Sequence, residues 1–232
     1  MKHILILLAF CSLSISFNAQ TSFTLQSGLF MNELEGGFVN TTSIKGTSLS
    51  IGLSIDHTRG RVFGWSCAYS AFNKSFEFGY PITTTGTIPQ DGHYATGYVV
   101  RAHELQSAFL MRLGKHINLS AGPYVQINTD DIIAGMGVDE DFYYPSLPQD
   151  LYNSIEFGYQ GKLQVQFFLG NHFYFGGFAN TGASVTDLRT KAWNDAWSFI
   201  TGQQEEWDST PVKNVYQHYG IFIGLRTKQK ED

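Results

Sequence analysis

Three histidines, His103, His172 and His218, lie on or near segments of alternating polarity that also carry serines and carboxylates. A serine activated by a histidine and an acid is the nucleophilic chemistry that these residue types allow. No spacing singles out a triad, because a triad is defined by its geometry in space. The sequence also contains no Gly-rich phosphate loop, no HExxH and no CxxC motif. We therefore expect no enzyme activity, no catalytic residues and no bound cofactor, and we expect the histidines to serve packing.

Charged residues offer two further kinds of site. The acidic run 138–141 could ligate a hard cation through its oxygens, but its spacing matches no calcium loop, which favours a solvated charge run and no metal. Glu104, Arg112, Glu156 and Lys162 lie on alternating segments. They either line a small channel or form an interior ion-pair network, and we favour the network if the fold is a narrow barrel.

The tryptophans gather in one part of the chain. Three of the four, Trp193, Trp197 and Trp207, lie in a single connection between alternating segments. Trp193, Trp197 and Ile200 follow an i, i+4, i+7 spacing, which predicts a short amphipathic helix over 190–201. The tryptophans either pack over the mouth of the fold or form an exposed anchor for a partner or a lipid surface.

The segments that would position these side chains alternate in polarity with a period of two, which is typical of strands with two different faces. In 154–169, for example, Ile155, Phe157 and Tyr159 share one face, and Glu156 and Gly158 lie on the other. We predict eight such strands over 22–33, 47–56, 61–75, 95–113, 117–130, 154–169, 172–186 and 215–227.

The connections between these segments alternate between long and short. Tight turns rich in Gly, Asn and His are predicted at 57–60, 114–116 and 170–171. Long connections are predicted at 34–46, 76–94, 131–153 and 187–214. Eight antiparallel strands with short turns at one end and long loops at the other predict an up-and-down β-barrel.

Composition limits the fold class and the partners. The 232 residues are 43% hydrophobic, 15% aromatic and 15% charged, with 24 glycines. A charged fraction below the usual value of about 25% excludes a disordered or charge-laced helical protein. The formal net charge of −5 argues against a nucleic-acid partner.

The N-terminus has the pattern of an export signal. A short basic start is followed by an apolar run over 4–10 and a small residue at 19. We predict residues 1–19 as a cleaved signal peptide and 20–232 as one barrel domain. Lipidation at Cys11 is disfavoured, because a bulky Phe precedes it. After cleavage only Cys67 remains, so no intramolecular disulfide forms and Cys67 is expected to pack in a strand.

The two faces of the strands decide between a membrane barrel and a soluble one. The polar face is mostly Ser, Gly, Gln, Asn and Thr, with few and balanced charges, which suits the filled interior of an eight-stranded barrel. The opposite face is dense in aromatic residues such as Trp65, Phe157 and Phe167, which favours a band that contacts lipid. We therefore predict an all-β, eight-stranded antiparallel up-and-down transmembrane β-barrel.

Two neighbouring segments resemble a known family. The stretch 103–113, His-Glu-Leu-Gln-Ser-Ala-Phe-Leu-Met-Arg-Leu, followed by 117–124, Ile-Asn-Leu-Ser-Ala-Gly-Pro-Tyr, resembles the strand pair of the PorT-like outer-membrane β-barrel domain family of Bacteroidota. The sequence departs from that family at Ala108, where Pro is usual, and at its charged C-terminal end. The resemblance implies an outer-membrane location and no particular chemistry.

These observations together predict an outer-membrane scaffold or a loop-displaying binding or adhesion protein. Its expected partners are outer-membrane lipid, the barrel insertion machinery and an extracellular or envelope partner at the long loops. Two alternatives stay open. One is a secreted or periplasmic soluble barrel that binds a small apolar ligand. The other is a lipid-modifying outer-membrane enzyme.

Overall fold

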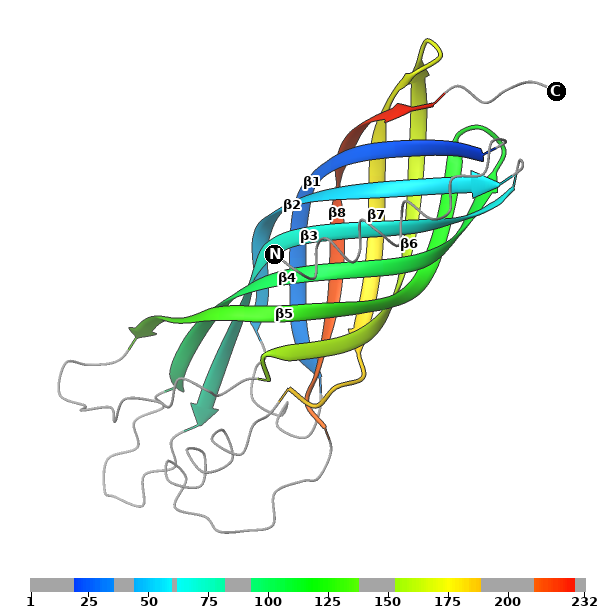
Figure 1. Cartoon of the computed structure of the whole chain (residues 1–232). Coiled ribbons are helices and arrows are strands. Elements are labelled where there is room, and N and C mark those ends of the chain that lie inside the picture. Colours follow the sequence, from blue (N-terminus) through cyan, green and yellow to red (C-terminus); the bar gives the residue numbers. More distant parts are fainter. Residues whose placement is uncertain are drawn as a thin grey trace, which may run out of the picture.

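The computed structural model describes residues 19–35, 44–59, 62–81, 93–137, 153–188 and 211–227. These residues form eight antiparallel strands that close into one barrel in chain order (Figure 1). The strands are β1 (Ala19–Glu35), β2 (Ile44–Arg59), β3 (Phe63–Pro81), β4 (His93–Leu113), β5 (Ile117–Gly137), β6 (Ile155–Leu169), β7 (Phe173–Ser184) and β8 (Lys213–Arg226). The predicted eight-stranded up-and-down barrel is confirmed. Within the described ranges, no helix has the length and apolar character needed to cross a membrane.

The strand ends that short connections join lie at one end of the barrel, which we call the turn end (Figure 1). The strand ends that long connections join lie at the other end, which we call the loop end. Gly114 and Gly170 adopt φ angles of 71° and 70° in two of the tight turns, a conformation that favours glycine. The turn predicted at 57–60 begins later, because β2 continues to Arg59.

Three of the predicted long connections are shorter than expected, and the first of them spans only 36–43. Strands β3 and β4 pair as far as Pro81 with His93, and β5 runs to Gly137. The alternation of apolar and polar residues stops before these points in the sequence, although the strands continue to pair through their backbones. The predicted strands therefore ended too early. The predicted helix over 190–201 lies outside the described residues.

Strand pairing is staggered around the barrel. A row of directly paired residues that starts at Glu156 of β6 passes through β5, β4, β3, β2, β1, β8 and β7. It returns to β6 at Gln166, ten residues nearer the turn end. Rows that run across the strands therefore descend obliquely along the barrel, which is the consequence of strand tilt in a closed sheet.

Side chains alternate between the interior and the outer wall as the sequence predicts. Leu53 on the wall is 59% exposed, whereas Gln164 in the interior is 5% exposed. On β6, polar Glu156, Gln160 and Lys162 are buried between exposed apolar neighbours. The polarity of a soluble protein is thus inverted. The wall is apolar, and the core is rich in polar and charged side chains.

Candidate functional site

The charged interior is the site that sequence reasoning singled out. Near the loop end, the Lys74 ammonium donates to Glu156 Oε2 at 2.5 Å, and both side chains are almost fully buried. Glu156 Oε1 accepts from Tyr124 Oη at 2.9 Å and from Asn214 Nδ2 at 3.3 Å. One carboxylate therefore joins side chains of β3, β5, β6 and β8 across the interior.

Glu104 lies close to this ion pair along the same row of paired residues. Its two carboxylate oxygens accept from the side-chain amides of Gln106 and Gln126. Gln126 is in direct register with both Glu104 and Glu156 on its neighbouring strands. Amide donors thus partly compensate a buried carboxylate that forms no ion pair with a cation among the described residues.

An aromatic cluster fills the interior at the same level. Phe30 stacks on Phe72 with ring centroids 3.8 Å apart, and Tyr216 lies 5.0 Å from Phe30 and 5.6 Å from Tyr124. Glycines on the paired strands make room for the rings. A Cβ at Gly182 would lie 2.5 Å from the Tyr216 ring.

Closer to the turn end, a second aromatic cluster combines Tyr174, Phe178 and Phe222. The Lys162 ammonium lies 4.8 Å from the centre of the Phe178 ring and donates to Gln26 Oε1 at 2.6 Å. Side chains therefore cross the described interior at both levels, as expected of a small barrel whose interior is packed.

The charges nearest the turn end have neutral partners. Asp56 accepts from Ser66 Oγ at 2.6 Å, and Arg112 donates to the side-chain oxygen of Gln20. Arg112 is half-buried, in contrast to the almost fully buried Glu104 and Glu156.

Each of the four predicted network residues has hydrogen-bond partners outside the set of four. Glu104, Glu156 and Lys162 lie in the interior, but no hydrogen bond or ion pair among the described residues joins any two of the four. Lys74 was not predicted as the partner of Glu156. The alternation of the strand places Lys74 on the interior face. Strands β3 and β6 are not neighbours, however, so a pairing of their side chains depends on the closed barrel and cannot be read from either strand.

The histidines occupy different environments. His218 Nε2 lies 2.5 Å from Ser50 Oγ, with both side chains buried in the interior. His103 Nδ1 lies 2.6 Å from Tyr69 Oη on the outer wall, and His172 follows the tight turn before β7. Aromatic side chains flank the Ser50–His218 contact, because the rings of Phe30 and Phe178 pack against the His218 ring.

Two other predicted sites fall outside the described residues. They are the acidic run 138–141 and the tryptophans Trp193, Trp197 and Trp207. Among the described side chains, no group of three or more His, Cys, Asp or Glu could hold a metal ion.

Comparison with known proteins gave no match to a protein-family model and none to a curated protein. The resemblance to the PorT-like family stays a prediction. Solved structures of similar shape include the outer membrane protein OprG of Pseudomonas aeruginosa, with 12% identity, a TM-score of 0.48 and coverage of 90% of this chain and 96% of that chain. Another is Ail, the attachment invasion locus protein of Yersinia pestis, with 8% identity, a TM-score of 0.39 and coverage of 91% and 100%. At these identities the likeness concerns the fold alone.

Proposed function

We propose that this chain is a small outer-membrane barrel that acts as a membrane-embedded scaffold and presents its long connections to a binding partner. The observation that carries the proposal is the inverted polarity of the barrel. Exposed apolar side chains cover the wall on all eight strands, and polar side chains fill the interior. A bilayer solvates such a wall at no hydrophobic penalty, whereas water does not.

The interior supports a scaffold role over a transport role. The Lys74–Glu156 ion pair and the cluster of Phe30, Phe72 and Tyr216 occupy the described interior. A conduit would need an aqueous or apolar passage where these side chains pack. Binding is therefore assigned to the loop end, where the strands joined by connections 36–43, 82–92, 138–154 and 185–212 end. The last of these carries Trp193, Trp197 and Trp207.

The same observations weigh against both alternatives. A soluble carrier of an apolar ligand needs an apolar interior, yet the interior contains Lys74, Glu104, Glu156 and Lys162. A lipid-modifying enzyme needs its nucleophile within reach of the bilayer, yet Ser50 and His218 are buried inside the barrel. We therefore propose that the protein performs no catalysis.

The membrane assignment is tested by placing a charge on the wall. Leu53→Arg sets a cation in the lipid-facing band, and we expect it to destabilise the inserted barrel by about 2–4 kcal/mol. Leu53→Phe is the matched control and keeps an apolar side chain at the same site. The measurement is the urea midpoint of the barrel in lipid vesicles, with the boiling-dependent gel shift as the sign of folding. A protein that stays soluble without detergent and tolerates Leu53→Arg would contradict membrane insertion.

The orientation is tested by chemical labelling of whole cells. A single cysteine placed at Trp197 in a Cys67→Ser background should react with a membrane-impermeant maleimide in intact cells. A cysteine placed at Lys115, in a tight turn, should react only after the outer membrane is opened. The opposite pattern would put the long connections in the periplasm and remove the proposed role in surface binding.

A further inference from the structure

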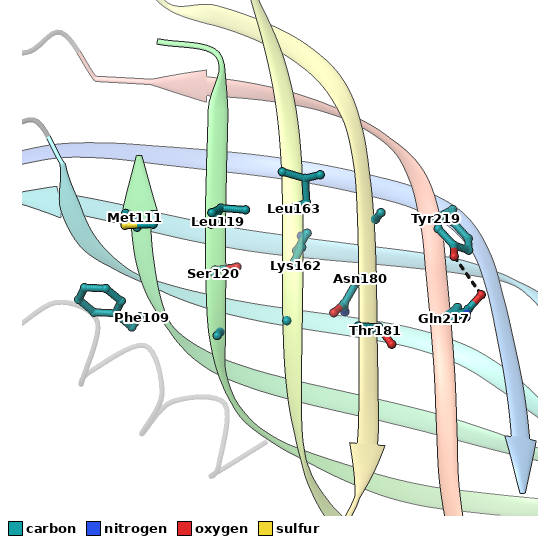
Figure 2. A pocket seen from close by; sticks show the side chains of 13 residues that line it. Phe109, Met111, Leu119, Ser120, Lys162, Leu163, Asn180, Thr181, Gln217 and Tyr219 are labelled. Carbon is teal, nitrogen blue, oxygen red and sulfur yellow. Dashed lines mark hydrogen bonds between the residues drawn. The ribbon is translucent and has the colours of Figure 1, made fainter. Parts of the chain in front are cut away.

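The outer wall carries a hollow of about 640 Å³ that crosses strands β4 to β8 (Figure 2). Its floor and rim follow one row of directly paired, outward-facing residues. This row runs from Gln217 through Thr181, Gly161 and Ala121 to Phe109. A hollow of this volume is within the range of small-molecule sites, about 300–1,000 Å³. It is a groove in the outer wall, and three residues of the interior face, Ser120, Lys162 and Asn180, also border it.

The groove exists because small residues sit side by side on neighbouring strands. Gly161 pairs directly with Ala121, and Ala179 faces the groove from β7. A Cβ built at Gly161 would meet no other atom within 4 Å, so the floor is open. Phe109 and Leu163, which are 59% and 42% exposed, rise beside this floor. The result is a trough with apolar sides.

The polarity of the groove changes along its length. At the β8 end, Tyr219 Oη donates to Gln217 Oε1 at 2.9 Å, which leaves the Gln217 N–H groups to face an acceptor (Figure 2). Thr181 lies beside Gln217 in register. At the β4 end, Phe109, Met111 and Leu119 line an apolar terminus. Rows of paired residues move toward the turn end as they pass from β8 to β4. The polar end of the groove, on β8, is therefore nearer the loop end than the apolar end on β4.

We propose that this groove binds one acyl chain of a bilayer lipid, with the ester or amide carbonyl of that lipid at Gln217. The inference rests on the proposed membrane insertion, since a groove in a lipid-facing wall is filled from the bilayer. The polar end lies nearer the loop end, and one of the two headgroup layers of the proposed bilayer surrounds the barrel at that end. A lipid acyl chain has the same order, with a polar carbonyl at one end and an apolar hydrocarbon tail at the other.

The shape of the groove favours a lipid chain over a second copy of the barrel. The exposed side chains of Phe109, Leu163 and Tyr219 line the groove and stand above its floor. The convex wall of another barrel would rest on these side chains and leave the floor unfilled. A flexible chain follows an oblique trough and fills it, which gains contact with the Gly161 and Ala121 backbone.

The test fills the groove with a side chain that projects from its own floor. Gly161→Leu places an apolar side chain over the floor, where the backbone leaves open space. Gly177→Leu is the matched control, since Gly177 also faces outward, its Cβ position has only one neighbour at 3.5 Å, and it is not part of the groove. Each refolded protein is placed in vesicles that contain phosphatidylethanolamine with a photoreactive diazirine in one acyl chain. Cross-linked peptides and lipids retained per barrel are then measured by mass spectrometry.

In the native protein, labels should concentrate on groove residues of β4 and β5, and one lipid should be retained per barrel. Gly161→Leu should lower both signals about tenfold, while Gly177→Leu leaves them unchanged. Gln217→Leu should abolish any preference for ester lipids over ether lipids and weaken retention about fivefold.

Equal labelling of all variants would overturn the inference. So would a change from dimer to monomer in Gly161→Leu without loss of lipid, because the occupant would then be a second copy. A boiling-dependent gel shift in every variant reports insertion separately, so a failed acyl site is distinguishable from a failed membrane assignment.

Discussion

The two halves of the barrel interior handle buried charge differently. At the loop end, Lys74 and Glu156 form a direct ion pair across the lumen, supported by Tyr124. At the turn end, Asp56 contacts a serine and Arg112 contacts a glutamine, without a direct ion pair among the described residues. The difference indicates that the loop end is the half whose stability depends on one specific pair, whereas the turn end tolerates neutral partners.

The largest expected effect comes from removing one member of the loop-end pair. Glu156→Leu leaves the Lys74 ammonium buried and unpaired, and we expect a loss of about 3–5 kcal/mol in the free energy of unfolding. The measurement is equilibrium urea unfolding in vesicles. The double variant Lys74→Met, Glu156→Leu should recover most of the loss, since two apolar side chains leave no isolated charge. A double variant as unstable as the single one would mean that the pair matters through packing and not through charge.

A smaller effect is expected for the hydrogen bond that supports this pair. Tyr124→Phe removes the 2.9 Å donor to Glu156 Oε1 and keeps the ring, so the expected loss is about 1.5–3 kcal/mol for a bond to a charged group. Tyr159→Phe is the control, because Tyr159 lies on the wall and is 65% exposed. The same urea measurement should place the control within about 0.5 kcal/mol of the native protein. Equal losses in both variants would show that Glu156 does not depend on Tyr124.

The smallest effect is expected at the turn end. Asp56→Asn removes a buried charge, but among the described residues it leaves no directly paired cation without its partner. The amide oxygen of the new side chain still accepts from Ser66. We expect a change of no more than about 1 kcal/mol in the free energy of unfolding. A loss as large as that of Glu156→Leu would erase the contrast between the two halves.

Period-two alternation was sufficient to predict the number of strands, and the alternation of long and short connections predicted their order. The polar residue types on one face predicted that residues such as Glu156 and Gln164 point inward. These properties can be read from single strands and from the connections between consecutive strands. The partners across the lumen depend on stagger and closure, which is why Lys74 was not matched with Glu156. His57 shows a related limit. Its parity places it on the wall, but it is buried by stacking on Trp65 and contacting Thr21.

The outer groove was also beyond sequence reasoning. Ala121, Gly161 and Ala179 are unremarkable within their own strands. They form a continuous floor only because β5, β6 and β7 are held in one register. A row of small residues across neighbouring strands is a property of the sheet, and no window of the sequence contains it.

Pairing of the first strand with the last has a consequence for how the chain folds. Thr227 donates its backbone N–H to the carbonyl of Thr21 at 2.8 Å, which joins two ends of the described chain. Until β8 is in place, β1 and β7 each expose an unpaired edge, and an exposed edge in an apolar phase leaves many backbone groups unsatisfied. Closure is therefore a late and cooperative step, because the partner of β1 is the last strand to be synthesised.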